Sequence, residues 1–400
     1  MERSASRLAA AFLLVLASVA ATACGGSNSG PPPQTAASGH GKVFVVPTAI
    51  ITPNGTTTVP ELQQKADAAF IAQKWKEAAD AYELLLKADP SGTSVPTYLF
   101  NGAMAHEGLG DQPGERQKAR DRYRELAARF PESANARLAL VRAATLHAYL
   151  EEWPALAEIG DQILARKDID DVDRMVGLGA RALAKVEQGN DAGARRDILD
   201  GIEISDRTHY SAPEVLPVAA AQLRFAYGEM KRIQSERIKF NPLPSDFLAA
   251  LEERSVLLLA AQEQYGIAVR SVDPHWAAMA GYRVGMLYRA LHHDLMLIPM
   301  PDAMKTDRQK QMFFAFMHVR YRVLLEKGLR QLDETLKFDD RVNESSTWRK
   351  RSEEAKKEIE MAIADEKAQI AKFPFTEADI QRTLDELSKD VARKKASKAP

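Results

Sequence analysis

The feature that most constrains the fold is a helical period of apolar residues that recurs in pairs from Glu61 onward. Small residues where two helices would cross allow close approach of the backbones, and aromatic residues fill the flanks. A proline at position 90 then ends the first pair. The chain therefore predicts stacked helix hairpins. In the first pair the shared faces carry Ala66, Ala69, Phe70, Trp75, Ala78, Tyr82 and Leu85.

This spacing resembles the tetratricopeptide repeat, whose signature positions are occupied here by Ala66, Trp75, Ala78, Tyr82 and Pro90. A second unit runs from 98 to 131 if about four residues near 112–115 are an insertion. It carries Ala103, Gly110, Ala119, Tyr123, Leu126 and Pro131. A third pair (135–165) and a fourth (172–199) follow by period and order. The resemblance covers residues 61–200 and implies a helix-hairpin solenoid.

The second half, residues 213–390, is also helical but has longer elements. Prolines and capping residues predict helices over 213–237, 245–270, 274–298, 306–337 and 345–372. Thr376 and Asp379 form a capping pattern for a last helix. A basic tail at 391–400 is expected to be frayed.

One stretch of this second half carries a further resemblance. Asp273-Pro274-His275-Trp276 continues through Gly285 and Tyr288 to Pro299-Met300-Pro301. It is similar to tetratricopeptide lipoproteins of deltaproteobacterial cell envelopes. The resemblance implies a cell-envelope location and gives no biochemical role.

The N-terminus has the pattern of a secretory signal peptide over residues 1–23. Arg3 and Arg7 precede an apolar run that ends at Cys24, the only cysteine of the chain. The ending Ala21-Thr22-Ala23-Cys24 resembles the lipobox of bacterial lipoproteins, although that family prefers Leu where Ala21 stands. The resemblance implies that Cys24 is acylated. The alternative is a secreted protein with an unmodified cysteine beside its cleavage site.

Residues 24–60 are expected to form the acylated cysteine and a flexible tether. Residues 25–41 contain no Lys, Arg, Asp or Glu and are rich in Gly, Ser and Pro, so they cannot bury enough surface to order themselves. Residues 43–46 and 50–51 are β-prone, which predicts either an extended strip packed on the body or a strand donated to a partner. The uncharged Gly25 implies, by the lipoprotein resemblance, the periplasmic face of the outer membrane.

Bulk composition excludes several classes of function. The 54 basic and 55 acidic residues balance, so the chain lacks the basic footprint of a nucleic-acid-binding protein. No apolar stretch after residue 24 reaches the roughly 18 residues that a spanning helix needs. With a single cysteine no internal disulfide can form, so stability must come from packing.

The sequence contains only weak matches to catalytic and metal-binding motifs. His106-Glu107 begins like a zinc-protease helix, but Gly110 stands where the second histidine should be. The pair His292-His293 precedes Asp294, and neighbours on a helix point about 100° apart, so a polar helix face is favoured over a metal site. The acidic run 168–173 lacks the glycine of a calcium loop and instead suits a helix start. We therefore expect no metal, no cofactor and no catalytic residues.

The stretch from 296 to 325 is unusually rich in methionine and aromatic residues, and no motif described above accounts for it. Because this helix is apolar on two faces, the region predicts either a buried core or an adaptable groove that binds a partner. The residues named for the groove are Phe313, Phe314, Phe316, Met317 and Tyr321.

These patterns predict an all-α solenoid of tetratricopeptide-like hairpins with longer C-terminal helices. The function expected is a membrane-anchored scaffold in the bacterial envelope, which binds other envelope proteins on its concave surface and is not an enzyme. One alternative is a component similar to the tetratricopeptide lipoprotein of outer-membrane-protein assembly, which is shorter than this chain. The other is an envelope enzyme, for which an acidic cleft near 250–330 would be the sign.

Overall fold

The computed structural model describes residues 49–52, 55–110, 112–209, 216–302, 304–342 and 346–396. Within these ranges the chain consists of fourteen α-helices and one short β-hairpin, so the predicted all-α class is confirmed. Cys24, the apolar run before it and residues 25–48 lie outside the described residues. None of the described helices combines the length and the apolar content needed to cross a bilayer.

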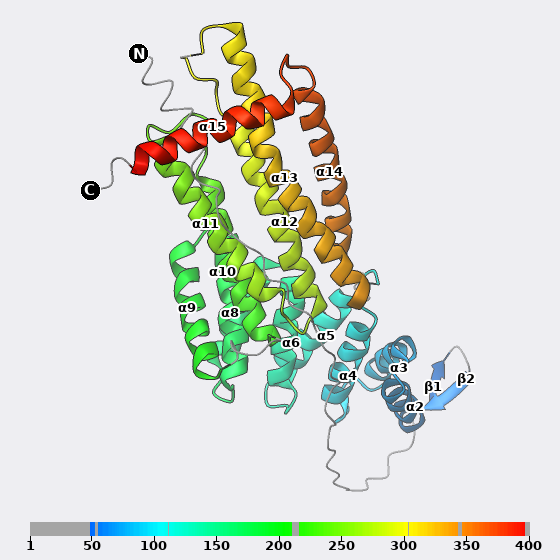
Figure 1. The fold of residues 1–400 in the computed structure, drawn as a ribbon. Coiled ribbons are helices and arrows are strands. Elements are labelled where there is room, and N and C mark those ends of the chain that lie inside the picture. Colours follow the sequence, from blue (N-terminus) through cyan, green and yellow to red (C-terminus); the bar gives the residue numbers. More distant parts are fainter. Residues whose placement is uncertain are drawn as a thin grey trace.

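Eight helices form the first half as four antiparallel pairs, which follow one another along the lower part of the molecule in Figure 1. Each second helix also packs on the first helix of the next pair, as in a solenoid. The eight helices are α2 (Val59–Ile71), α3 (Trp75–Ala88), α4 (Val95–Gly108), α5 (Glu115–Arg129), α6 (Ala136–Tyr149), α7 (Trp153–Ala165), α8 (Asp171–Glu187) and α9 (Asp191–Arg207).

Each pair turns through one residue with a left-handed backbone conformation. Two of the four are glycines, which adopt this conformation without steric cost. At three turns the following residue donates its backbone N–H to a carbonyl of the last helical turn, which closes the helix end. The turn residues are Gln73 (φ 57°), Gly110 (φ 64°), Glu151 (φ 58°) and Gly189 (φ 79°).

These turns set the register of the repeats. A fully buried alanine lies seven residues before each turn residue, at Ala66, Ala103, Ala144 and Ala182. On the second helices the equivalent buried positions are Ala78, Ala119, Leu156 and Ala194. The second repeat needs four additional residues before its second helix, and α5 accordingly begins only at Glu115. The structure therefore gives the third and fourth pairs a definite register.

A β-hairpin precedes the first repeat. Strands β1 (Ala49–Thr52) and β2 (Gly55–Thr58) pair antiparallel, with Ile50 opposite Thr57. Thr58 then caps α2, and the Glu61 carboxylate accepts from the Thr58 backbone N–H at 2.9 Å. The flexible tether that we expected to reach residue 60 is therefore wrong for this stretch, because backbone pairing and the cap order it.

The second half contains six longer helices. In Figure 1 α13 runs antiparallel to α12 and α14, and α15 crosses near their far end. The helices are α10 (Val218–Arg237), α11 (Phe247–Ala268), α12 (Pro274–Met296), α13 (Asp307–Val342), α14 (Thr347–Ile370) and α15 (Glu377–Ala396).

Two boundaries of this half differ from the expectation. The helix predicted from residue 213 begins at Val218, because the backbone of Leu216 pairs with Arg270 and Val272 instead. The last helix continues to Ala396, through most of the tail that we expected to be frayed, and residues 397–400 lie outside the described residues.

Two hydrophobic clusters account for most of the interior. The smaller one joins α2 and α3 of the first repeat to one face of α4, from Leu62 to Ala105. The larger one is continuous from Val95 in the second repeat to Trp348 in α14. The core therefore does not break near residues 200–213, where the repeats give way to the long helices. Among the repeats, the first is the one held by the smaller cluster, and two further small clusters lie among α12 to α15.

This division leads to a prediction for the first repeat. Ala78 is fully buried at the crossing of α2 and α3, so Ala78→Arg should force the helices apart at a cost of about 2–4 kcal/mol. Because the first repeat has a separate core, hydrogen exchange should accelerate in α2 and α3 and remain slow from α6 onward. Ala68→Arg, at an exposed position of α2, is the control. A uniform acceleration across the chain would contradict the modular account.

Candidate functional site

The residues that resemble the repeat signature form the interior of the first two repeats. Ala66, Ala78, Tyr82, Ala119 and Tyr123 are buried. Trp75 is half-buried, and Pro90 and Pro131 are exposed where one pair leads into the next. The hydroxyls of the two signature tyrosines donate to carboxylates of the preceding helices, to Asp67 at 2.7 Å and to Glu107 at 2.9 Å. These residues hold the repeats together.

The methionine- and aromatic-rich region does not form the groove that we considered. Phe313, Met317 and Tyr321 are buried, and Phe316 packs half-buried against the cluster that joins α13, α14 and α15. Only Phe314 is exposed, at 43% of its surface. The physical reason is that α13 lies between α12 and α14 with α15 across it, so both of its apolar faces are used for packing.

The histidines that attracted attention in the sequence are paired separately. His106 Nδ1 lies 2.6 Å from Glu115, and its other ring nitrogen faces Glu83. His292 lies 3.2 Å from Glu366, whereas Asp294, two residues later, pairs with Arg254 at 2.6 Å. Among the residues that the structure describes, no group of three His, Cys, Asp or Glu side chains is arranged to hold a metal ion.

The most densely built site joins the two halves of the chain, and its centre is the segment Asp273–Trp276. Asp273 caps α12 by accepting from the His275 backbone N–H at 2.9 Å. The Asp273 carboxylate also accepts from the hydroxyl of Tyr149, at the end of α6. The cap of a long helix is thereby fastened to the third repeat.

His275 and Trp276 fill the space behind this cap. The ring of His275 lies 3.8 Å from that of Tyr149, centroid to centroid. Trp276 is fully buried and meets Tyr149 and Phe225 edge-on. Aromatic contacts of this kind add roughly 0.5–1.5 kcal/mol each to the burial of the rings. Helices α6, α10 and α12 therefore converge on one aromatic cluster.

Two arginines complete the junction. Arg116 of α5 lies 3.2 Å from His275 Nδ1 and over the ring of Tyr149. Because a guanidinium only donates, Nδ1 must accept, so His275 is neutral here. Burial, together with the positive charges of Arg116 and Arg351, holds the pKa of His275 well below its usual value. Arg351 of α14 stacks on Trp348 and pairs with Glu151 in the turn of the third repeat.

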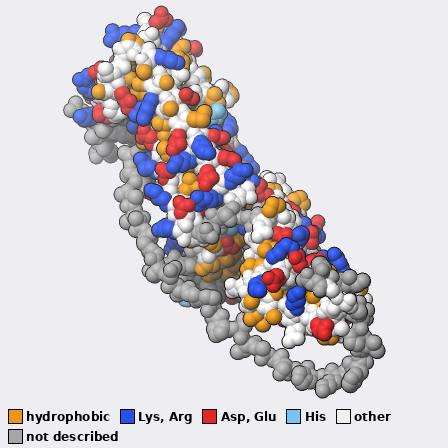
Figure 2. Space-filling view, turned by 90° about the vertical axis from the view of Figure 1, so that its right-hand side faces the viewer, with side chains coloured by type: hydrophobic (Ala, Val, Ile, Leu, Met, Phe, Trp, Pro, Cys, Tyr) orange, Lys and Arg blue, Asp and Glu red, His pale blue; other side chains and the backbone are white. Residues whose placement is uncertain are grey.

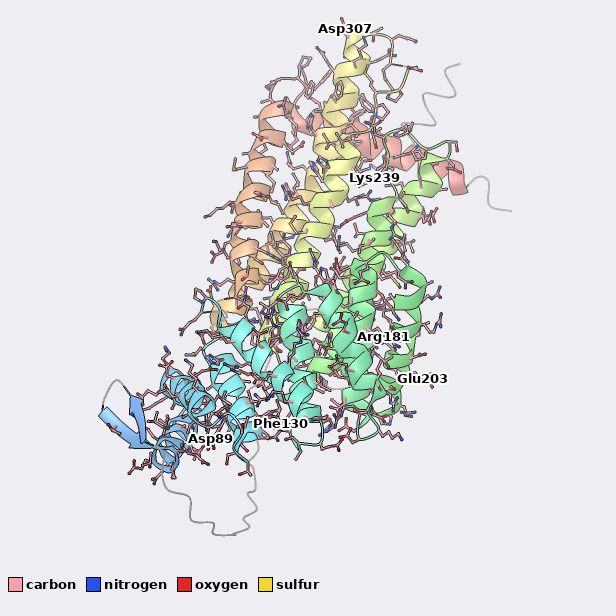
Figure 3. The ribbon with its side chains drawn as sticks, turned by 180° about the vertical axis from the view of Figure 1, so that it is seen from behind. Asp89, Phe130, Arg181, Glu203, Lys239 and Asp307 are labelled. Atoms are coloured by element: carbon pink, nitrogen blue, oxygen red, sulfur yellow. The ribbon has the colours of Figure 1, made fainter. Side chains whose placement is uncertain are left out.

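The junction around Asp273 meets the second and third repeats near one edge, and α10 in addition packs along α8 and α9 of the fourth repeat. Figure 3 shows Asp89 and Phe130, which follow α3 and α5, on the lower edge, whereas the long helices rise from the opposite edge toward Asp307. Tyr149 and Glu151, two of the residues that contact the second half, lie at the turn between α6 and α7. The third repeat is therefore held at its turn, whereas the fourth is held along its helices.

A second cluster of buried charge lies between α8, α10, α11 and α12. Glu229 is fully buried and accepts from the Tyr265 hydroxyl, while Arg232 and Arg283 lie 2.6 Å and 2.8 Å from its oxygens. Burial alone would raise the pKa of Glu229, but the two guanidinium groups outweigh it and hold the pKa at about 2. Buried charges persist only when they are paired in this way.

Glu187, the last residue of α8, adjoins this cluster. Burial raises the pKa of Glu187 to about 7, and the neighbouring Glu229 carboxylate adds to the effect, while Arg283 and Arg232 oppose it. Two adjacent carboxylates whose pKa values lie this far apart are an arrangement that enzymes use for acid–base chemistry. Here, however, the carboxylate with the low pKa, Glu229, is already engaged by Tyr265 and both arginines.

The raised pKa predicts a specific pH dependence. The folded protein holds a proton on Glu187 up to about pH 7, whereas the unfolded chain loses it near 4.5, so stability falls as pH rises between these values. Glu187→Gln cannot ionise and should lack this loss. The rise in melting temperature of Glu187→Gln over the parent should therefore be larger at pH 8 than at pH 5.5. An equal difference at both pH values would show that Glu187 is not protonated near neutrality.

Sequence analysis singled out Asp273–Trp276 by resemblance alone and missed the two clusters as such, because their members come from distant parts of the chain. Arg116 and Tyr149 meet Asp273 only in the folded state, and nothing in their local spacing indicates this. A weaker signal existed for Glu229, a carboxylate inside the apolar helix α10 with an arginine three residues later. Such a residue in an otherwise buried helix needs a partner.

Comparison with known proteins adds little. No family model matches the chain, and no curated protein matches it. Among solved structures it is similar to a tetratricopeptide repeat protein from Parabacteroides merdae, with 13% identity, 75% of this chain and 98% of that chain covered, and a TM-score of 0.39. Because that score is low, the assignment of tetratricopeptide-like helix hairpins rests on the helix pairing and register described above.

Proposed function

We propose that this protein is a scaffold for protein–protein interactions, anchored through an acylated Cys24 to the outer membrane and facing the periplasm. The apolar run that ends at Cys24 and the lipobox-like residues before it support the anchor. The helix-hairpin repeats support the binding function, since stacked hairpins present extended surfaces to other proteins. The partners are other proteins of the envelope.

The observation that carries the proposal is the way the repeats are mounted. The long-helix half packs on the fourth repeat through α10 and contacts the second and third repeats near their turns, through Arg116, Tyr149 and Glu151. The first repeat and its hairpin project from the body, as Figure 1 shows, and α2 packs chiefly on α3. Ile71, at the end of α2, is 82% exposed. The first repeat and its hairpin, which we call the arm, present helix surface to a partner, while the junction holds the other repeats in place.

Two alternatives can be tested against this proposal. A component of outer-membrane-protein assembly would share the anchor and the N-terminal repeats, and it would co-purify with a β-barrel assembly complex. An envelope enzyme would use the pair Glu187 and Glu229, the arrangement closest to acid–base machinery in the described residues. Loss of a measured turnover in Glu187→Gln, with binding intact, would favour the enzyme.

The anchor makes a direct prediction. Mass spectrometry of the membrane fraction should show a diacyl or triacyl adduct on an N-terminal Cys24, because the acylated thiol becomes the mature N-terminus in lipoproteins. Cys24→Ser should lack this adduct, because the thiol that accepts the acyl chain is gone. A free Cys24 thiol in membrane-bound protein would disprove this form of anchoring.

The arm makes the second prediction. Ile71→Asp should lower the yield of crosslinked partner on affinity purification of the lipidated protein, by about fivefold or more, because apolar anchors dominate interface energies. The protein should remain folded, since Ile71 is exposed. Met361→Asp changes a residue of α14 that is 67% exposed and serves as the matched control. Equal yields from both variants would exclude the arm as the contact surface.

A further inference from the structure

Helix α11 has an outer face that nothing in the described chain covers. The helix packs on α10 and α12 through an inner face that includes Leu251, Leu258 and Tyr265. On the outer face Leu248, Val256 and Leu259 are 43%, 60% and 44% exposed. The spacing of eight and then three residues places these three side chains along one side of the helix. Large apolar residues in a row on one exposed helix are characteristic of an interaction surface.

The charges on this face all have one sign. Glu252, Glu253 and Glu263 are exposed, and no ion pair joins them to another described residue. The one basic residue within α11, Arg254, is buried and paired with Asp294. On the face shown in Figure 2, by contrast, basic and acidic side chains alternate over the long helices. The outer face of α11 is therefore an apolar stripe interspersed with unpaired carboxylates.

We propose that this outer face of α11 binds a basic amphipathic helix of a partner protein. Leu248, Val256 and Leu259 contact the apolar side of that helix, and its Lys or Arg side chains pair with Glu252 and Glu263. The stripe from Leu248 to Glu263 runs about 22 Å at 1.5 Å per residue, which a helix of about 15 residues matches. The mode of binding is a helix laid along a surface by its apolar face. This proposal rests on the scaffold function above and names the chemistry of one partner.

The charge distinguishes this occupant from two others. A second copy of this chain would bring the same carboxylates face to face, and like charges across an interface disfavour association. An anionic membrane surface would likewise be repelled by Glu252, Glu253 and Glu263. A basic helix satisfies both components of the surface, because it offers apolar contact and compensating charge together.

A designed peptide tests the proposal with the full-length protein. The probe is a fluorescent 18-residue helix of leucine and lysine, with the leucines at i, i+3, i+4 and i+7 spacing. Two comparison peptides replace lysine by glutamate or scramble the order so that no apolar face forms. Fluorescence anisotropy should show saturable binding of the first peptide alone, weakened by added salt. Equal binding of the scrambled peptide would overturn the proposal, because it would show attraction by charge without a helix face.

Variants locate the site. Glu252→Lys with Glu263→Lys should weaken binding roughly tenfold, since two attractive charge pairs are lost and the reversal adds repulsion. Val256→Asp with Leu259→Asp should abolish it. The control Glu203→Lys with Glu354→Lys reverses two exposed carboxylates on α9 and α14 and should change the affinity less than twofold. Equal losses in the control and in the α11 charge variant would overturn the assignment.

Two further outcomes would also contradict it. If Leu259→Asp converts a dimer to a monomer in sedimentation, the occupant is a second copy. If the peptide binds only after residues 391–400 are removed, the chain's own basic tail occupies the face. Failure of the proposal is separable from failure of the scaffold function, because partner capture through Ile71 on the opposite half does not involve α11.

Discussion

The seating of His275 and Trp276 against the second and third repeats is the contact on which the rest of the structure depends. Helix α10 packs on its neighbours α8 and α9 as the next helix of the series, whereas α12 reaches the earlier repeats through this contact. Trp276 is fully buried where α6, α10 and α12 meet, and Asp273 is fastened to Tyr149. Two kinds of helical packing thereby become one continuous core, from Val95 to Trp348.

The buried ion pairs of Glu229 stabilise the same packing of the long helices. Glu229 has no exposed surface, so its carboxylate stabilises the fold only while Arg232, Arg283 and Tyr265 remain in place, and these residues come from three helices. Removing one partner leaves a buried charge uncompensated, which typically costs about 3–5 kcal/mol. The cluster therefore favours one relative placement of α10, α11 and α12. This packing leaves two surfaces exposed, the first repeat and the outer face of α11. It also holds them at a fixed separation.

Much of the fold could be predicted from the sequence, because the repeats obey local rules. The small residues at Ala66 and Ala78 and the insertion before Glu115 follow from helix period and turn spacing alone. Burial in the second half could not be predicted in the same way. Phe313 and Phe314 are adjacent and chemically identical, yet one is core and the other exposed, because the packing of α12, α14 and α15 decides which face of α13 is covered. The junction of Arg116, Tyr149 and Asp273 depends on contacts across more than a hundred residues, which no local pattern records.

The packing of α10 on α8 and α9 joins the two halves, and we infer that Trp276 extends this interface by tying α12 to the second and third repeats. Hydrogen exchange of Trp276→Ala, compared with the parent protein, tests this most directly, since removing a buried tryptophan typically costs about 3–5 kcal/mol. Our account predicts faster exchange in α5, α6, α10 and α12 together, with α2 and α3 unchanged because the first repeat has its own core. Faster exchange confined to α12, with α5 and α6 as protected as before, would contradict it.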